Sequence, residues 1–227
     1  MTRTSEIMVC IFKADDGLSR EERLLWAAEH YFGSTADTIP AKRAEDGERS
    51  GVHVERELLQ VEKTPLGKPF FPKFPHLHLS ISHSGTYWVC ALAPVEVGVD
   101  IQEHTMNRSE TRQEATSRFA KMARRFFHPV EAKFVETESF YRFFGVWAAR
   151  ESYVKYTGQG IDASFSEHCV IPEAEEMQQP LNTLLGQENG VSWQAQGVWF
   201  WETVFEENYT LCVCAGEEMP CRVIRCF

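Results

Sequence analysis

Short runs of apolar and β-branched residues, separated by Gly, Pro, Ser or Asn, dominate the hydrophobic pattern of this chain and predict β-strands. The predicted strands are Ile7–Lys13, Leu58–Lys63, His78–Ser82, Tyr87–Ala93, Val97–Ile101, Val198–Phe205 and Tyr209–Ala215. Between them, apolar residues recur with helical periodicity and predict helices at Arg20–Phe32, Glu110–Phe127, Pro129–Glu136 and Glu138–Tyr156. Weakly periodic polar residues at 33–51 and 173–196 predict exposed loops. The pattern indicates an α+β fold.

Two pairs of segments in the chain resemble each other at nearly the same offset. Tyr87–Ala93 recurs as Tyr209–Ala215, 122 residues later, and Leu25–Ala28 recurs as Val146–Ala149, 121 residues later. Agreement between the two offsets is better evidence than either match alone, and it predicts two lobes of similar helix-plus-sheet build. We place the N-terminal lobe at residues 1–97 and the C-terminal lobe at residues 98–227, with a site in the cleft between them.

The composition, with 43% hydrophobic and 25% charged residues, excludes a disordered chain, a collagen and a coiled coil. A net charge of -10 argues against nucleic acid or an anionic membrane as the main partner. No run approaches the roughly 18 consecutive apolar residues of a membrane helix, and the N-terminus lacks the apolar segment of a signal peptide. We therefore expect a cytoplasmic protein whose seven cysteines are free thiols.

The segment Val97–Gln102, which includes the predicted strand Val97–Ile101, contains the first cluster of residues that could take part in a reaction. Strand alternation places Asp100 and Gln102 on one face, with Val99 and Ile101 on the other. An acidic side chain among apolar neighbours needs a partner, and a divalent cation with oxygen ligands would supply one. The alternative is an Asp at a strand end that caps the backbone or faces water.

The helix predicted at Glu138–Tyr156 carries the second cluster. One face presents Phe140, Phe144, Trp147, Glu151 and Lys155 at helical spacing. An exposed Glu-to-Lys pair is the simple interpretation. The shared face with Trp147 instead indicates ionisable groups at the margin of a core.

The third cluster joins Gly67-Lys68-Pro69 to the segment Ser80–Gly85, which reads SISHSG. Hydroxyls, backbone amides and the His83 imidazole in one turn suit a phosphate, and Lys68 would add a positive charge. An ordinary hairpin connection is the alternative.

Taken together and in this order, the clusters resemble the 4′-phosphopantetheinyl transferases, specifically the two-lobed surfactin-synthetase-activating type. The matching segments are Gly67–Pro69, Ile81–Gly85, Gly98–Ile101, Arg125–Phe127 and Trp147–Lys155. The family's hallmark is a Gly-x-Asp strand followed by W-x-x-K-E-[AS]-x-x-K on a helix. The resemblance implies an α+β fold of two lobes related by pseudo-twofold symmetry, with the active site in the cleft between them.

The resemblance also implies a reaction, the transfer of the phosphopantetheine arm of coenzyme A to a serine of an acyl or peptidyl carrier protein, with release of 3′,5′-ADP. It implies Mg²⁺ on the pyrophosphate, held by Asp100 and Glu151. Glu151 would also take the proton of the attacking serine, and Lys155 would neutralise phosphate charge. Three further residues match positions that bind the phosphates of coenzyme A, namely Lys68, Ser82 and His83.

Three positions depart from the family pattern. Gln102 stands where many relatives carry Glu, so its amide oxygen can face the metal without adding charge, and we expect weaker Mg²⁺ binding. Arg150 replaces the usual Lys. The N-terminal lobe is short, so Arg20 or Arg23 is left to hold the 3′-phosphate, although surface arginines would look the same.

The departures at Gln102 and Arg150 favour a second hypothesis, a catalytically degenerate module that binds coenzyme A or the carrier. Retention of Asp100, Glu151 and Lys155 favours the enzyme, because a binding module has no need of the base. A metal-dependent phosphohydrolase ranks last, since it predicts a carboxylate-rich two-metal site and only one Asp-plus-Glu pair is found.

The segment Arg118–Phe127 is the most basic part of this acidic chain. Helical spacing groups its residues into a basic face and an apolar face, namely Arg118, Lys121 and Arg125 opposite Phe119, Met122 and Phe126. Carrier proteins of the family are generally acidic, so we predict that this helix contacts the carrier. We also expect a monomer, because an internally duplicated chain forms its own pseudo-dimer.

Overall fold

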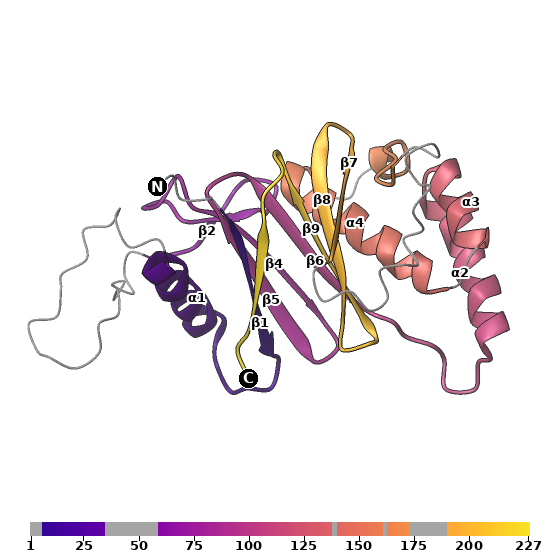
Figure 1. The fold of residues 1–227 in the computed structure, drawn as a ribbon, viewed down its shortest axis with the longest axis horizontal. Helices are drawn as coiled ribbons and strands as arrows, with labels where there is room; N and C mark the ends of the chain where they lie inside the picture. Colours follow the sequence, from indigo (N-terminus) through magenta and orange to yellow (C-terminus); the bar gives the residue numbers. More distant parts are fainter. Residues whose placement is uncertain (1–5, 35–58, 138–139, 161–162, 173–189) are drawn as a thin grey trace, which may run out of the picture.

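The computed structural model describes residues 6–34, 59–137, 140–160, 163–172 and 190–227 (Figure 1). Its elements, in chain order, are β1 (Ile7–Lys13), α1 (Arg20–Ser34), β2 (Glu62–Lys63), β3 (Pro69–Phe70), β4 (His78–Ser84), β5 (Tyr87–Ala93), β6 (Val97–Glu103), α2 (Arg112–Phe126), α3 (Pro129–Thr137), α4 (Tyr141–Thr157), the 3-10 helix η2 (Ala163–Ser166), β7 (Val191–Ala195), β8 (Val198–Phe205), β9 (Tyr209–Ala215) and β10 (Cys221–Arg225). The predicted α+β class is confirmed.

Two four-stranded sheets form the body of the molecule, with strand orders β10-β1-β5-β4 and β6-β9-β8-β7. The order β1-β5-β4 of the first sheet repeats as β6-β9-β8 in the second. The pairing direction repeats too, because β1 pairs antiparallel with β5 and β6 pairs antiparallel with β9. This arrangement supports the internal repeat that the sequence predicts.

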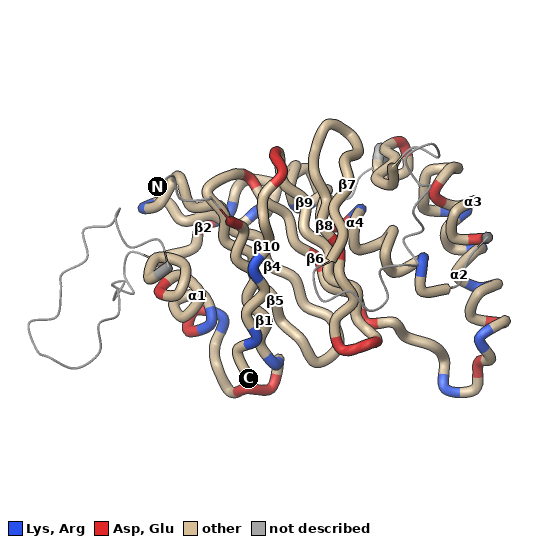
Figure 2. The backbone as a smooth tube through the Cα atoms, in the orientation of Figure 1, with Lys and Arg blue, Asp and Glu red and all other residues tan. Residues whose placement is uncertain are grey.

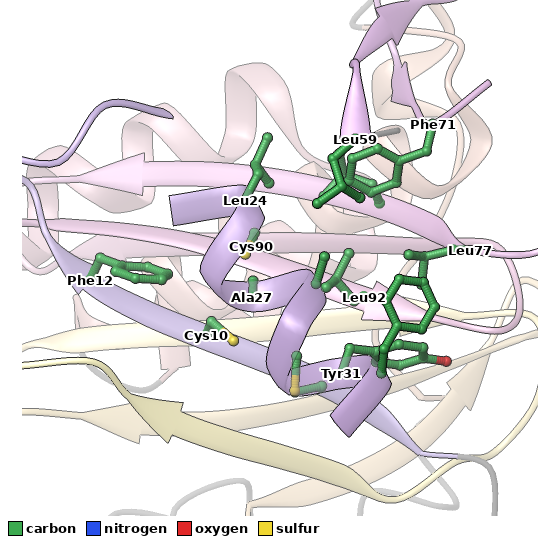
Figure 3. Packing of buried hydrophobic residues seen from close by; sticks show 14 of the residues in the cluster. Cys10, Phe12, Leu24, Ala27, Tyr31, Leu59, Phe71, Leu77, Cys90 and Leu92 are labelled. Atoms are coloured by element: carbon green, nitrogen blue, oxygen red, sulfur yellow. The ribbon is translucent and has the colours of Figure 1, made fainter. Parts of the chain in front are cut away.

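Strand alternation sorts the side chains of both sheets into separate cores. Odd-numbered residues such as Val9, Val89, Val99 and Val213 meet in one core between the two sheets. Even-numbered residues of β1 and β5, Cys10 and Cys90 among them, pack against α1 (Figure 3). Cys212 and Cys214 of β9 pack against α4. Helix α1, the first sheet, the second sheet and α4 therefore lie in successive layers (Figure 1).

The N-terminal half of α4 packs against α2 and α3 through a cluster of aromatic rings. Phe119 of α2 lies 4.7 Å from Phe143 and 4.9 Å from Phe144, measured between ring centroids. Thr111 and Glu114 cap the start of α2 with reciprocal side-chain-to-backbone hydrogen bonds. Helix α4 is therefore packed between the second sheet on one side and helices α2 and α3 on the other.

Three strands lie where the sequence pattern did not predict them, namely the two-residue β3, which pairs with β2, and the longer β7 and β10. Residues 191–195 of the predicted loop form β7, and Trp193 is buried there, donates to the Val170 carbonyl at 2.8 Å and stacks on Phe200. That part of the loop prediction is wrong, while residues 173–189 and 35–51 lie outside the described residues. Strand β10 pairs in parallel with β1, so the end of the chain joins the first sheet.

The division into lobes at residue 97 stays a prediction. Strand β10 crosses this division, because it follows residue 97 in the sequence but pairs with β1 of the first sheet. The predicted strand at Leu58–Lys63 shrinks to Glu62–Lys63 within the described residues. All seven cysteines are free thiols, as expected. In the described part of the chain, no helix has both the length and the apolar character needed to cross a membrane.

Candidate active site

Strand β6 and helix α4 approach each other unusually closely at Gly98. A Cβ atom added to Gly98 would lie 1.9 Å from the Ser152 carbonyl oxygen and 2.6 Å from the Tyr156 nitrogen. Only a residue without a side chain allows this backbone approach. Because Glu151 and Lys155 flank this contact on α4, the glycine brings both side chains beside the carboxylate of Asp100 on β6.

Asp100 is the centre of a hydrogen-bond network that joins three elements. Its Oδ1 accepts from the Lys155 ammonium at 2.6 Å and from the Ser82 hydroxyl at 2.6 Å, and its Oδ2 accepts from the Gln102 amide at 2.7 Å. The Asp100 residue is only 2% exposed, so it does not face water at a strand end. Three donors, one of them charged, compensate the burial of this carboxylate.

Glu151 lies half-buried on α4, one turn before Lys155. Burial raises the pKa of Glu151, the negative charge of Asp100 raises it further, and Lys155 lowers it. The two carboxylates therefore repel each other, and Lys155 opposes this effect. A carboxylate in this setting is a stronger proton acceptor than one in water.

The donor set of this site consists of oxygen atoms that suit a hard cation. Within the described ranges, His, Cys, Asp and Glu side chains do not gather in groups of three or more that could hold a metal ion. Asp100 and Glu151 provide two carboxylates. Gln102 also carries an amide oxygen, while its amide nitrogen donates to Asp100. The negative charge of Asp100 disfavours ionisation of Glu151, and a bound divalent cation would favour the ionised form of both groups. By their chemistry, these side chains suit a hard cation.

Of the predicted coenzyme A residues, Ser82 joins the Asp100 network directly. Lys68 lies at the C-terminal end of α4, where it donates to the Tyr156 carbonyl at 2.6 Å and pairs with Glu96. His83 is exposed, and strand alternation turns it to the opposite face of β4 from Ser82. Their roles toward coenzyme A stay predictions.

Arg150 has a structural role that its sequence position did not suggest. It is 2% exposed, pairs with the buried Glu131 of α3 and donates to the His168 carbonyl at 2.8 Å. Its guanidinium also lies over the Phe165 ring at 4.4 Å. Glu131 is 19 positions away in the sequence, and no local pattern signals the pairing. Arg150 thus ties α4 to α3 and is absent from the Asp100 network.

Arg23 is also buried, and it binds groups of its own lobe. It binds the Asp16 carboxylate at 2.5 Å and the carbonyl oxygens of Lys13 and Ala14. The Nε and Nη2 groups of Arg23 are therefore used within the fold, and its role toward a 3′-phosphate stays a prediction. The expectation for Arg20 stays untested.

Helix α2 carries a shallow depression with basic and apolar walls, and basic residues follow α2 at the end of the molecule opposite α1 (Figure 2). The lining includes Ser117, Lys121, Met122, Arg125 and Phe126. Phe126 is 38% exposed and Phe119 is buried, so the apolar face that helical spacing predicts is buried only in part. The buried face of α2 is formed by Ala115, Phe119 and Ala123 instead. We call the surface of Lys121, Met122, Arg125 and Phe126 the α2 patch.

Comparison with known proteins agrees with this geometry. Residues 96–214 match the 4′-phosphopantetheinyl transferase superfamily. The chain is 33% identical over 109 residues to a 4′-phosphopantetheinyl transferase of Bacillus subtilis, covering 46% of this chain and 43% of the relative. It is 32% identical over 127 residues to a putative 4′-phosphopantetheinyl transferase of Synechocystis, covering 52% and 46%. The chain therefore matches less than half the length of these relatives. The matched segment contains Asp100, Gln102, Glu151 and Lys155.

Proposed function

The chain belongs to the 4′-phosphopantetheinyl transferase superfamily, and from this premise we propose that it transfers the 4′-phosphopantetheine arm of coenzyme A to a serine of an acyl or peptidyl carrier protein. The observation that carries the proposal is the network around Asp100, in which Lys155 and Ser82 meet the carboxylate and Glu151 lies one turn away. All these side chains converge where α4 approaches β6.

The reaction needs a base, charge neutralisation and alignment. The oxygen of the carrier serine forms a bond to the phosphorus that bears the pantetheine arm, and the bond from that phosphorus to the leaving 3′,5′-ADP breaks. Glu151 accepts the proton of the serine hydroxyl, a role that its raised pKa suits. Lys155 has three N–H donors, of which two bind Asp100 and Ser82, and the third is left for a phosphate oxygen.

Asp100 and Glu151 would hold Mg²⁺, with the Gln102 amide oxygen as a neutral third donor. When bound, the ion neutralises charge on the pyrophosphate. The chain contributes the setting for it, because Asp100 is buried and fixed by three donors. Gln102 carries no charge, whereas a glutamate at this position would add a third carboxylate. We therefore expect this protein to need a higher Mg²⁺ concentration for activity than an enzyme with three carboxylates at its site.

The carrier would dock on the α2 patch. Arg118 is engaged by Glu110 at 2.8 Å, while Lys121 and Arg125 have no ion pair within the described residues. Exposed Phe126 lies beside them, so the surface combines free positive charge with an apolar anchor, as an acidic amphipathic helix would require. Charge reversal at both positions, K121E with R125E, should raise the KM for the carrier and leave the KM for coenzyme A unchanged. An unchanged carrier KM would overturn this docking assignment.

The direct test is the intact mass of an apo carrier protein after incubation with this protein, coenzyme A and Mg²⁺. We expect a gain of one phosphopantetheine that disappears without metal and falls strongly in the Glu151→Gln variant. Glu21→Gln, which changes an exposed carboxylate at the start of α1, is the matched control and should behave like the wild type.

A coenzyme A- or carrier-binding module without turnover is the second candidate, and Gln102 is the observation in its favour. The same experiment separates the two candidates when coenzyme A binding is measured in parallel by calorimetry. Binding without any mass gain on acyl, polyketide and peptidyl carriers would establish the module and refute the transferase.

A further inference from the structure

Three serine hydroxyls on β4 accept hydrogen bonds from backbone amides of β6. Ser80 Oγ accepts from Val99 N at 2.9 Å, Ser84 Oγ accepts from Glu103 N at 3.0 Å, and Ser82 Oγ lies 3.5 Å from Ile101 N. We call this row of contacts the serine seam. Residue numbers rise together along both strands at a constant offset of 19, so β4 and β6 run parallel along the seam.

The serine seam provides hydrogen-bond acceptors for backbone amides at the unpaired edge of β6. Strand β4 is the edge of the first sheet and β6 is the edge of the second, so β6 has a ladder of backbone hydrogen bonds only toward β9. On its other side, Val99 and Ile101 are buried and Glu103 is half-buried, and a buried N–H without an acceptor is costly. Serine side chains at alternate positions of β4 all point to one face and supply the missing acceptors. In a continuous sheet, backbone carbonyls of β4 would accept these hydrogen bonds. Here the hydroxyls of the serine side chains accept them and join the two sheets.

The seam surrounds the carboxylate of the candidate site. Val99 and Ile101 are the two sequence neighbours of Asp100, and the amides of both are held from β4. The middle hydroxyl, that of Ser82, accepts from Lys155 and from Ile101 and donates its single proton to Asp100. The position of Asp100 relative to α4 therefore depends on contacts made by the first sheet.

We infer that Ser80 and Ser84 are positioning residues for the reaction. They fix the backbone of β6 on both sides of the Ser82 contact, and through it they set the distance from Asp100 to Lys155 and Glu151. Ser80 is 3% exposed and its contact with β6 lies inside the protein, so it acts through the strand rather than on a substrate. This inference rests on the transferase function for its kinetic consequence, whereas its geometric consequence does not depend on activity.

The geometric consequence is tested with Ser80→Ala and Ser84→Ala by two measurements. The amides of Val99 and Glu103 should exchange with deuterium faster, each in the variant that lacks its own acceptor. Acylation of Lys155 by a trace of acetic anhydride, followed by mass spectrometry, should accelerate severalfold, because the ammonium is held less firmly by Asp100. Ser192→Ala, at an exposed position of β7, is the matched control and should change neither rate.

The kinetic consequence is a fall in kcat of about tenfold for Ser80→Ala, the scale of one lost hydrogen bond to a buried group, with little change in the KM for coenzyme A. Ser84→Thr should restore whatever Ser84→Ala loses, because it returns the hydroxyl. A purely structural seam would lower the midpoint of unfolding and leave both kcat per folded molecule and Lys155 acylation at wild-type values.

The outcomes separate the two proposals. Unchanged amide exchange refutes the seam, and faster exchange with unchanged Lys155 acylation refutes the positioning role. If the wild type modifies no carrier, the transferase function fails, but the exchange and acylation measurements still decide on the seam.

Discussion

Gly98→Ala adds one methyl group at the point where β6 and α4 touch. The new Cβ would lie 1.9 Å from the Ser152 carbonyl oxygen, and contacts below 3.0 Å are essentially never found. The obstructing atoms belong to the helix backbone, so no side-chain rotation can relieve the clash. Helix α4 must therefore move away from the second sheet by about 1 Å, the difference between these two distances.

A shift of that size acts on both stability and the site. Overpacking of a closely packed interior typically costs about 1–3 kcal/mol, which for a protein of this length lowers Tm by about 2–12 °C. The hydrogen bond from Lys155 to Asp100 is 2.6 Å long and would stretch beyond 3.5 Å if α4 moved as one body. Misplacement of reacting groups by about 1 Å can cost about 100-fold in rate.

The assay combines thermal unfolding with the transfer rate per folded molecule. Gly145→Ala on the same helix is the matched control, because its Cβ would meet only the flexible carboxylate of Glu202, at 3.1 Å. The control also gains about 1 kcal/mol of helix propensity, so its Tm should stay level or rise. If Gly98→Ala kept the wild-type Tm and rate, the close approach of β6 to α4 would be refuted.

Three further perturbations have expected outcomes. Arg150→Met leaves Glu131 buried without its cation and should lower the free energy of unfolding by about 3–5 kcal/mol. Arg124→Met, which breaks the exposed pair with Glu136, is the control and should leave the free energy of unfolding close to that of the wild type, both read from urea unfolding. Burial raises the pKa of Glu202 to about 7, so the folded state binds more protons than the unfolded state between its ordinary pKa and pH 7. The stability of the wild type relative to Glu202→Gln should therefore fall as pH rises through that window, and equal slopes in the two proteins would contradict it. Gln102→Glu removes the amide donor to Asp100 and adds a negative charge, so Tm should fall without Mg²⁺ and rise more steeply than the wild type when Mg²⁺ is titrated in.

The sequence predicts the exact bounds of some strands, among them β5 and β9, whose continuous apolar runs are typical of buried strands. Strands β5 and β9 are apolar on both faces, because each is packed between a helix layer and the core between the sheets. Strand β10 escapes prediction because its stability comes from pairing with β1, which lies about two hundred residues earlier. Strand β7 escapes because Trp193 is its single deeply buried side chain. Nonlocal pairing of this kind leaves no periodicity to detect.

In the candidate site, too, the contacts within one strand or one helix could be predicted from the sequence, and the contacts between sheets could not. Helical and strand periodicity place Glu151 with Lys155 and Asp100 with Gln102, and the structure brings these two pairs together. The contact of Ser82 with Asp100 joins edges of two different sheets, so no spacing along the chain encodes it. The same holds for Phe126, since the turn from α2 to α3 buries Phe127 and leaves Phe126 at the surface.

The case for a degenerate binding module changes once Arg150 is located. From sequence, Arg150 counts as a departure at the site, yet its guanidinium binds Glu131 and the His168 carbonyl between α4 and its neighbours. A planar group with several donors suits this buried position better than an ammonium would. The argument for degeneracy then rests on Gln102 alone. Its amide donates to Asp100, a bond that a glutamate cannot make when ionised, so this residue contributes to the order of the network while it lowers the charge available to a metal. A module that only binds has no use for a carboxylate held beside Asp100 with a raised pKa, and Glu151 is such a carboxylate.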